Sequence, residues 1–307
     1  MQEVSKKRIG ILRGGAGDHY HASIKKGGDM IMHIAENLSN KYKIVDILID
    51  QDGVWHINGL PVSNPHEVTN KVDIVWNHSH PSFGNMLKNL LVPHISEDAF
   101  SHALENSKEM LKAHMEKLDV FMPRSLVLPV YQEDFDGPRE KYAIKKAKEI
   151  HAKLGAAWSV KSFTPDSTMG IHLAKTFPEL IRSIEDGVNH NKSILVEEFI
   201  SGKVAALHSV PSFRNQKIYI FPFGNTFGSF NEEEKNKLHD LVKKIHNYIG
   251  NVNYLKSDFV INNRGRVYVL GITTTPNLKS DSHFAEVCGI LNLKPHDVVD
   301  HIIQSYL

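Results

Sequence analysis

The chain of 307 residues has little cysteine and no excess of charge of one sign. The single cysteine, Cys288, excludes an intramolecular disulfide and a metal site built from several cysteines, and it fits a reducing compartment. The 36 lysines and arginines nearly balance the 35 aspartates and glutamates, so no bulk charge favours nucleic acid or an acidic membrane as a partner. An anionic ligand would have to be bound by a local site.

Long apolar runs are also absent. No segment approaches the roughly 20 apolar residues of a membrane span, and the polar start MQEVSKK leads directly into a strand-like segment, without the apolar core of a signal peptide. The 19 histidines are scattered and show no H-E-x-x-H spacing. We therefore expect a cytoplasmic protein with neither a membrane nor a nucleic-acid partner.

The N-terminal part has the pattern of a small α/β domain. Residues 8–12 form an apolar strand that runs into the glycine-rich stretch 13–18, and a helical pattern follows as far as Leu38. Further strands are predicted at 42–49, 54–57 and 72–77. We expect a largely parallel sheet that ends near Pro93, within a domain of residues 1–97.

The rest of the chain alternates helices with strands and closes with a hairpin, which predicts domains of residues 98–190 and 191–307. Helices are predicted at 98–118, 139–153, 177–188 and 232–248, and strands at 125–128, 158–161, 193–200, 205–210 and 218–222. The hairpin strands 257–261 and 267–270 flank the turn Asn263-Arg264-Gly265-Arg266. This order predicts an α/β chain that becomes α+β in its C-terminal part.

Residues 250–290 pair the two hairpin strands with an aspartate and then with the loop Gly-Ile-Thr-Thr-Thr-Pro-Asn. This run resembles the nucleotide and metal end of the ATP-grasp superfamily, and the order of the elements along nearly the whole chain resembles its D-alanine–D-alanine ligase branch. The resemblance implies an ATP-grasp fold preceded by a small Rossmann-like (pre-ATP-grasp) domain. It also implies an ATP-dependent carboxylate–amine ligase that works through an acyl phosphate, with ATP and Mg²⁺, small-molecule substrates and a homodimer.

Two lysines match residues that contact nucleotide phosphates in this family. Lys161 ends an apolar strand beside a loop of small residues, a position that favours phosphate binding over a place in the core. Lys108 lies in a predicted helix, where a solvated lysine is an equally good interpretation.

The remaining nucleotide residues follow from the same resemblance. The Gly-Ser-Ser-x-Gly loop over the phosphates is matched by Ser167, Thr168 and Gly170, with Asp166 in place of a glycine, and an ordinary polar turn stays an alternative. Ser167 is also a catalytic candidate. Glu197 matches the acceptor of the adenine amino group, and the positions around the ring are Phe199 and Ile200.

The metal ligands are altered. Where the family has Asp, Glu and Asn, this chain has Asp258, Gly271 and Thr273. Mg²⁺ prefers carboxylate, phosphate and water oxygens, so glycine in place of glutamate removes a charged ligand. Asp258 is the predicted metal ligand, and the pattern puts Mg²⁺ binding in doubt.

The substrate residues differ as well. Gly14 and Gly15 match a substrate loop or make a tight strand-to-helix turn, and His19 replaces the glutamate that orients an ammonium group. Ser282 matches a serine that binds the second substrate's carboxylate, while His283 replaces the leucine after it.

Two further differences from the family concern catalysis and the closure of the active site. Lys256, the other catalytic candidate, replaces an arginine that stabilises the tetrahedral intermediate, and it lacks the planar bidentate fork. Only residues 224–230 stand where the family has a mobile loop over the active site. Two hypotheses follow: a ligase whose substrates differ from two D-alanines, or an impaired ATP-grasp protein that acts as a nucleotide-binding or regulatory module.

Overall fold

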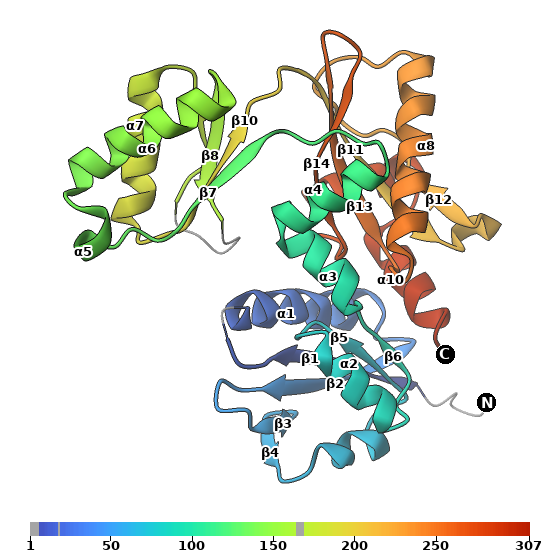
Figure 1. The fold of residues 1–307 in the computed structure, drawn as a ribbon. Coiled ribbons are helices and arrows are strands. Elements are labelled where there is room, and N and C mark those ends of the chain that lie inside the picture. The colour runs from blue at the N-terminus through green and yellow to red at the C-terminus, as the bar shows by residue number, and fades with distance from the viewer. Residues whose placement is uncertain (1–5, 18, 164–168) are drawn as a thin grey trace. The chain divides into compact units, whose positions relative to one another are not determined.

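The computed structural model describes residues 6–17, 19–163 and 169–307. They form two compact units, of which unit 1 comprises Met1–Asp119, Lys203–Phe259 and Gly271–Leu307 and unit 2 comprises Val120–Gly202 and Val260–Leu270 (Figure 1). The three predicted domains stay a prediction. Within the described ranges, no helix is long and apolar enough to cross a membrane.

A six-stranded sheet forms the N-terminal part of unit 1, in the order β4-β3-β2-β1-β5-β6. Its strands are β1 (Lys7–Gly14), β2 (Tyr42–Ile49), β3 (Trp55–Ile57), β4 (Leu60–Val62), β5 (Ile74–Asn77) and β6 (His94–Ile95). The four strands β2, β1, β5 and β6 are parallel, which confirms the predicted sheet, and β3 and β4 add antiparallel arms. Three helical segments accompany it: α1 (Tyr20–Asn37), η1 (Pro65–Asn70) and α2 (Ser82–Asn89).

The single helix predicted over 98–118 is wrong, because the chain forms two helices, α3 (Ala99–Asn106) and α4 (Lys108–Lys117). Ser107 between them has extended backbone, with φ −125° and ψ 109°, and its side chain accepts a hydrogen bond from the Met110 amide. This N-cap satisfies an amide that would otherwise lack a partner at the start of α4. Lys108 therefore stands in the first turn of α4.

The second sheet of unit 1 has the order β12-β11-β13-β14. Its strands are β11 (Gly202–Pro211), β12 (Ile218–Ile220), β13 (Leu255–Asn262) and β14 (Val267–Thr273), and η2 (Phe213–Asn215), α8 (Glu232–Ile249), α9 (His283–Ile290) and α10 (Pro295–Gln304) accompany them. The predicted hairpin is confirmed: the Asn262 amide donates to the Arg266 carbonyl, and Gly265 has the positive φ of a turn residue. The hairpin end, Val260–Leu270, groups with unit 2.

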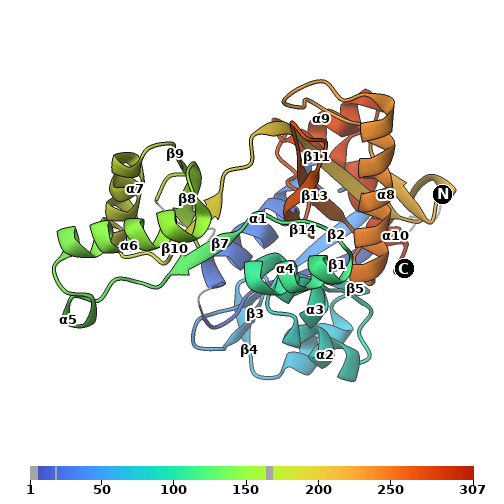
Figure 2. The same cartoon turned by 45° about the horizontal axis from the view of Figure 1, so that its top comes forward.

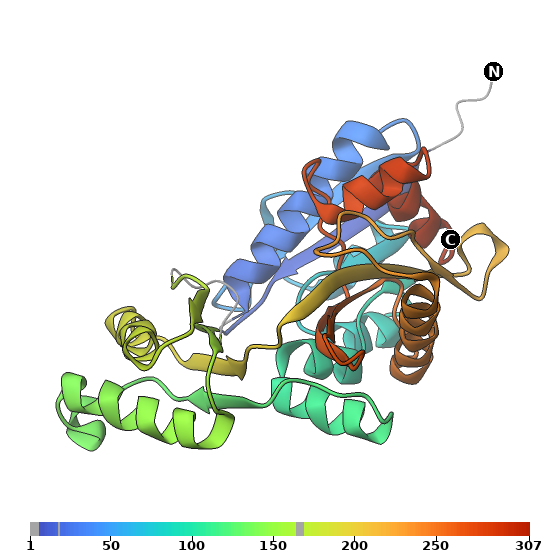
Figure 3. The same cartoon turned by 90° about the horizontal axis from the view of Figure 1, so that it is seen from above.

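One hydrophobic core connects the two sheets of unit 1. It includes side chains from the first sheet, from α1, from β12 and the residue after it, and from the C-terminal helices, among them Ile9, Met30, Phe221, Phe284 and Val299. Figure 3 shows α1 in blue beside the red C-terminal helices, and α1 contacts α10. Cys288 is fully buried here, as its apolar surroundings in the sequence indicate.

Unit 2 contains an antiparallel sheet in the order β7-β10-β8-β9 (Figure 2). Its strands are β7 (Ser125–Leu128), β8 (Trp158–Ser162), β9 (His172–Ala174) and β10 (Ile194–Glu198), and its helices are α5 (Glu133–Asp136), α6 (Arg139–Leu154) and α7 (Phe177–Asn189). Apolar residues of α6 and α7, such as Ala147 and Ile184, share a core with the strand residues Trp158 and Val196. A capping box of Thr176 and Glu179 begins α7.

Candidate functional site

Lys161 and Glu197, two of the predicted nucleotide residues, lie together on the sheet of unit 2. Leu195 pairs with Lys161 across β10 and β8, so Glu197 and Lys161 are diagonal neighbours on one face. The Lys161 Nζ is 2.7 Å from the Glu197 Oε2, and the Glu197 side chain is only 10% exposed. The nearby ammonium compensates for the burial of this carboxylate.

The other predicted nucleotide residues of unit 2 lie around the ends of these strands. Phe199 follows β10, is 41% exposed, and donates its amide to the Ala157 carbonyl; Ile200 beside it is half-buried. Gly170 is exposed just before β9. Ser167 and Thr168 lie outside the described residues.

Lys256 and Asp258, predicted as catalytic residue and metal ligand, form an ion pair in unit 1. They stand two residues apart on β13, so both side chains point to the same face of the strand. The Lys256 Nζ is 2.9 Å from Asp258 Oδ1 and 3.1 Å from Oδ2. Both carboxylate oxygens of Asp258 are thus within reach of one ammonium.

The other two predicted ligand positions, Gly271 and Thr273, lie at the end of β14. A Cβ atom added to Gly271 would lie 3.8 Å from the Lys108 Nζ, so the position without a carboxylate faces a cation. Among the residues that the structure describes, no group of three or more histidine, cysteine, aspartate or glutamate side chains could hold a metal ion. Asp258 is therefore the one carboxylate among these three positions, and any further oxygen ligands of a Mg²⁺ ion would have to come from phosphates and water.

Gly14 and Gly15 make a tight turn at the end of β1. Their φ values are 87° and 100°, which glycine adopts readily, and the Gly15 amide donates to the Ile49 carbonyl over 2.8 Å. A Cβ atom at Gly14 would lie 2.0 Å from the Ile49 oxygen. This geometry accounts for both glycines through the turn alone. His19 follows at the start of α1, where its side chain caps no amide.

Ser282 begins α9 as its N-cap. Its hydroxyl accepts from the Ala285 amide over 3.1 Å and donates to the Asn277 carbonyl over 2.8 Å. The hydroxyl proton is therefore already used within the fold, and the binding of a substrate carboxylate by this group would require the bond to Asn277 to break.

A hydrogen-bonded chain of His283, His208 and Tyr254 lies beside Ser282. The His283 Nδ1 is 2.7 Å from the His208 Nε2, and the His208 Nδ1 is 2.6 Å from the Tyr254 hydroxyl. Burial lowers the pKa of His208 to about 3, so the imidazole is neutral at pH 7. No sequence pattern indicates this hydrogen-bonded chain, because its members come from β11, from the segment before β13 and from α9.

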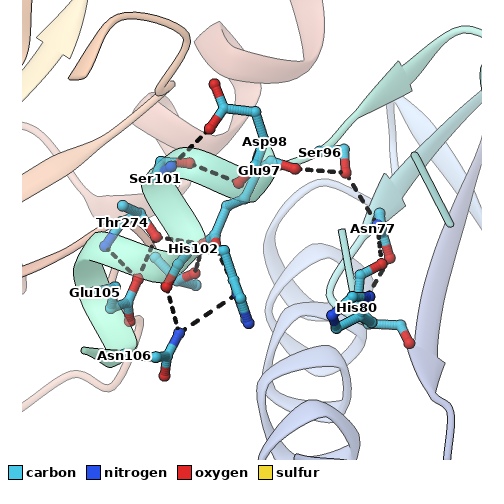
Figure 4. Close-up of polar contacts among 12 residues, drawn as sticks. Asn77, His80, Ser96, Glu97, Asp98, Ser101, His102, Glu105, Asn106 and Thr274 are labelled. Atoms are coloured by element: carbon cyan, nitrogen blue, oxygen red, sulfur yellow. Dashed lines mark hydrogen bonds and ion pairs between the residues drawn. The ribbon is translucent and has the colours of Figure 1, made fainter. Parts of the chain in front are cut away.

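A network around Glu97 was also missed in the sequence (Figure 4). The Thr274 hydroxyl contacts the carboxylates of both Glu97 and Glu105, and the Thr274 amide donates to Glu105 over 3.0 Å. The His102 Nδ1 is 3.4 Å from Glu97, and the His19 ring lies 5.7 Å from the His102 ring. Glu97 follows β6 at the carboxyl end of the parallel strands, where ligands bind in many α/β sheets. This position after a strand is the sequence feature that could have identified Glu97 as a candidate site residue.

Glu97 stays ionised in this network. Burial opposes ionisation, but hydrogen bonds from His102 and Thr274 outweigh it and lower the pKa of Glu97 to about 2. The carboxylate of Glu97 therefore supplies a negative charge near His19, which stands where the resemblance leads us to expect a glutamate.

No family model matches the chain. Two curated relatives are D-alanine–D-alanine ligases: that of Geotalea uraniireducens is 22% identical, with 99% of this chain and 97% of the relative covered, and that of Halothermothrix orenii is 21% identical, with 99% of each covered.

Solved structures of ligases are similar to this chain along nearly its whole length. The D-alanyl-alanine synthetase A of Vibrio cholerae matches with a TM-score of 0.70 at 14% identity and 99% coverage of both chains. The VanG D-Ala:D-Ser ligase of Enterococcus faecalis also has a TM-score of 0.70, at 18% identity, with 99% of this chain and 100% of the ligase covered. This chain therefore has the ATP-grasp fold, and over nearly its whole length it resembles the D-alanine–D-alanine ligases.

Proposed function

We propose that the protein is an ATP-dependent ligase that joins a small carboxylate to an amine, with substrates other than two D-alanines. The observation that carries this proposal is the length of the match: 99% of this chain aligns with 97% or more of ligases from two bacteria. The match thus extends over nearly the whole length of these ligases.

The reaction runs in two balanced steps. A carboxylate oxygen of the first substrate attacks the γ-phosphorus of ATP and ADP leaves, which gives an acyl phosphate. The amine of the second substrate then attacks the acyl carbon, the C–O bond to phosphate breaks, and the nitrogen loses a proton. Both steps need neutralised phosphates and a stabilised oxyanion.

We assign these tasks to charged residues on the two sheets. In unit 2, Lys161 contacts a phosphate and Glu197 accepts from the adenine amino group, with Phe199 and Ile200 beside the ring. In unit 1, Lys108 contacts a phosphate and Lys256 stabilises the oxyanion. The 2.7 Å ion pair of Lys161 and Glu197 supports the first assignment, because it holds both groups at one edge of the nucleotide position.

Residues on the substrate side support altered substrates. His19 has no fixed negative charge for an ammonium group, whereas Glu97 and Glu105 supply carboxylates nearby. His283 is held by His208 where the family has leucine, so a polar group meets the second substrate. An amino acid or another small carboxylate, with an amine partner, fits this environment.

A nucleotide-binding or regulatory module without catalysis is the second candidate. The observation that favours it is the pairing of Asp258 with Lys256 together with the missing carboxylate at position 271. The family resemblance further suggests a homodimer and a cytoplasmic location, and light scattering of the purified protein would test the first of these.

The test is ADP release from ATP over a panel of amino acids and amines that includes D-alanine. A ligase releases ADP faster when its substrates are present, and Lys161→Met should reduce that stimulation, whereas Lys153→Met, an exposed residue of α6, should leave it unchanged. Nucleotide binding without any stimulated ADP release would instead favour the regulatory module.

A further inference from the structure

Asp258 is engaged by a cation of the protein itself. Both of its oxygens lie within 3.1 Å of the Lys256 Nζ. The two side chains are about equally exposed, at 32% for Asp258 and 31% for Lys256. A Mg²⁺ ion bound by Asp258 would have to displace this ammonium or share one carboxylate with it, and two cations on one carboxylate repel each other. Asp258 is therefore built as the partner of Lys256.

A second ammonium lies at the position of the missing carboxylate. A Cβ atom added to Gly271 would lie 3.8 Å from the Lys108 Nζ, and Lys108 is the first residue of α4, directly after the N-cap Ser107. A side chain of the family type at position 271 would point towards this cation. Lys108 and the ion pair of Lys256 and Asp258 thus both belong to unit 1.

We propose that Lys256 and Lys108 supply the cationic charge for the polyphosphate of a nucleotide, so that binding needs no Mg²⁺, and that Asp258 is the ion-pair partner of Lys256 and not a metal ligand. This inference rests on the proposed nucleotide binding. Ammonium groups bind phosphate oxygens through charge-assisted hydrogen bonds, and unlike Mg²⁺ they need no octahedral ligand set. The ligand class is a metal-free nucleoside di- or triphosphate.

The two possible roles of Asp258 predict opposite results for Asp258→Asn. If Asp258 holds a metal ion, the substitution weakens the binding of Mg²⁺–ATP. If it is only the ion-pair partner of Lys256, the substitution removes an anion that competes with the phosphates for this ammonium, so metal-free ATP binds as tightly or more tightly.

The experiment is calorimetric titration of the full chain with ATP, once in EDTA and once in excess Mg²⁺. We expect affinities equal within about twofold in the two buffers, and a loss of about tenfold, the equivalent of one charge-assisted contact, for Lys256→Gln and for Lys108→Gln. Lys117→Gln, at the exposed far end of α4, is the matched control and should not change the affinity. Circular dichroism of each variant checks that it is folded.

Binding of ATP that requires Mg²⁺ and is lost in Asp258→Asn would overturn this inference while leaving the proposed ligase intact. An absence of ATP binding in both buffers would overturn the inference and the proposed function together. Electron paramagnetic resonance of added Mn²⁺, without nucleotide, gives a readout independent of activity: we expect the spectrum of the free ion, and an immobilised signal that Asp258→Asn abolishes would contradict the proposal.

Discussion

Glu97 is a half-buried carboxylate whose charge the fold stabilises through His102 and Thr274. The pKa of Glu97 is lowered to about 2, below its unfolded value. A lowered carboxylate pKa contributes stability above the unfolded pKa, and this contribution is lost as the pH falls through the folded pKa. For Glu97 that window runs from about pH 4.5 down to about pH 2.

Glu97→Gln should therefore destabilise the protein at pH 7 by about 1–3 kcal/mol, because a charged acceptor of buried hydrogen bonds is lost. Urea denaturation at pH 7 and at pH 3 measures the effect, and the difference from the wild type should be smaller at pH 3. Glu116→Gln, an exposed residue of α4, is the control and should have no effect at either pH. An equal loss for Glu97→Gln at both pH values would show that the charge of Glu97 does not matter.

Gly14 is required by the geometry of the turn after β1. Gly14→Ala should cost more than Gly17→Ala, because both positions have positive φ but only Gly14 would place its Cβ atom against the Ile49 oxygen. We expect a difference of roughly 1–3 kcal/mol in the free energy of unfolding. Thermal denaturation of the two variants measures it, and equal losses would mean that the backbone moves to remove the overlap.

At the scale of elements, the longer strands were predicted because their apolar runs are short and end at turn residues, whereas the strands β4, β6 and β9, of two or three residues each, were not predicted. The strands at 42–49 and 125–128 agree with β2 and β7 at both ends. Residues 98–118 were predicted as a single helix because their apolar residues continue at helical spacing on both sides of Ser107. The role of Ser107 as an N-cap depends on its extended backbone, which this spacing does not reveal. The Lys161–Glu197 pair follows from two adjacent strands, whereas the contacts of Glu97 and Glu105 with Thr274 join segments about 170 residues apart.

The break between α3 and α4 gives a prediction at this scale. Ser107→Ala should destabilise the protein by about 1 kcal/mol, because the Met110 amide loses its side-chain acceptor. Ser107→Asp, which keeps an acceptor at the N-cap, should retain the wild-type midpoint in chemical denaturation. A neutral Ser107→Ala would indicate that water replaces the cap.

At the scale of the whole molecule, the order of elements identified the fold, since an arrangement of strands and helices survives when individual ligands change. Identity with the ligases is only 21–22%, yet 99% of the chain aligns with them. The substrates were not predictable, because the residues that would select them, His19, His283 and Glu97, depart from the family pattern or enter the site through tertiary contacts alone.

The proposed activity of this protein, which has the ATP-grasp fold, is the joining of a carboxylate to an amine. The most direct measurement is simultaneous quantification, by mass spectrometry, of ADP and of any new amide after incubation with ATP and pairs of amino acids or amines. The account predicts ADP and an amide product in equal amounts for at least one pair, and a reduced yield of both in Lys256→Gln. Bound ATP that remains intact with every pair would contradict ligase activity.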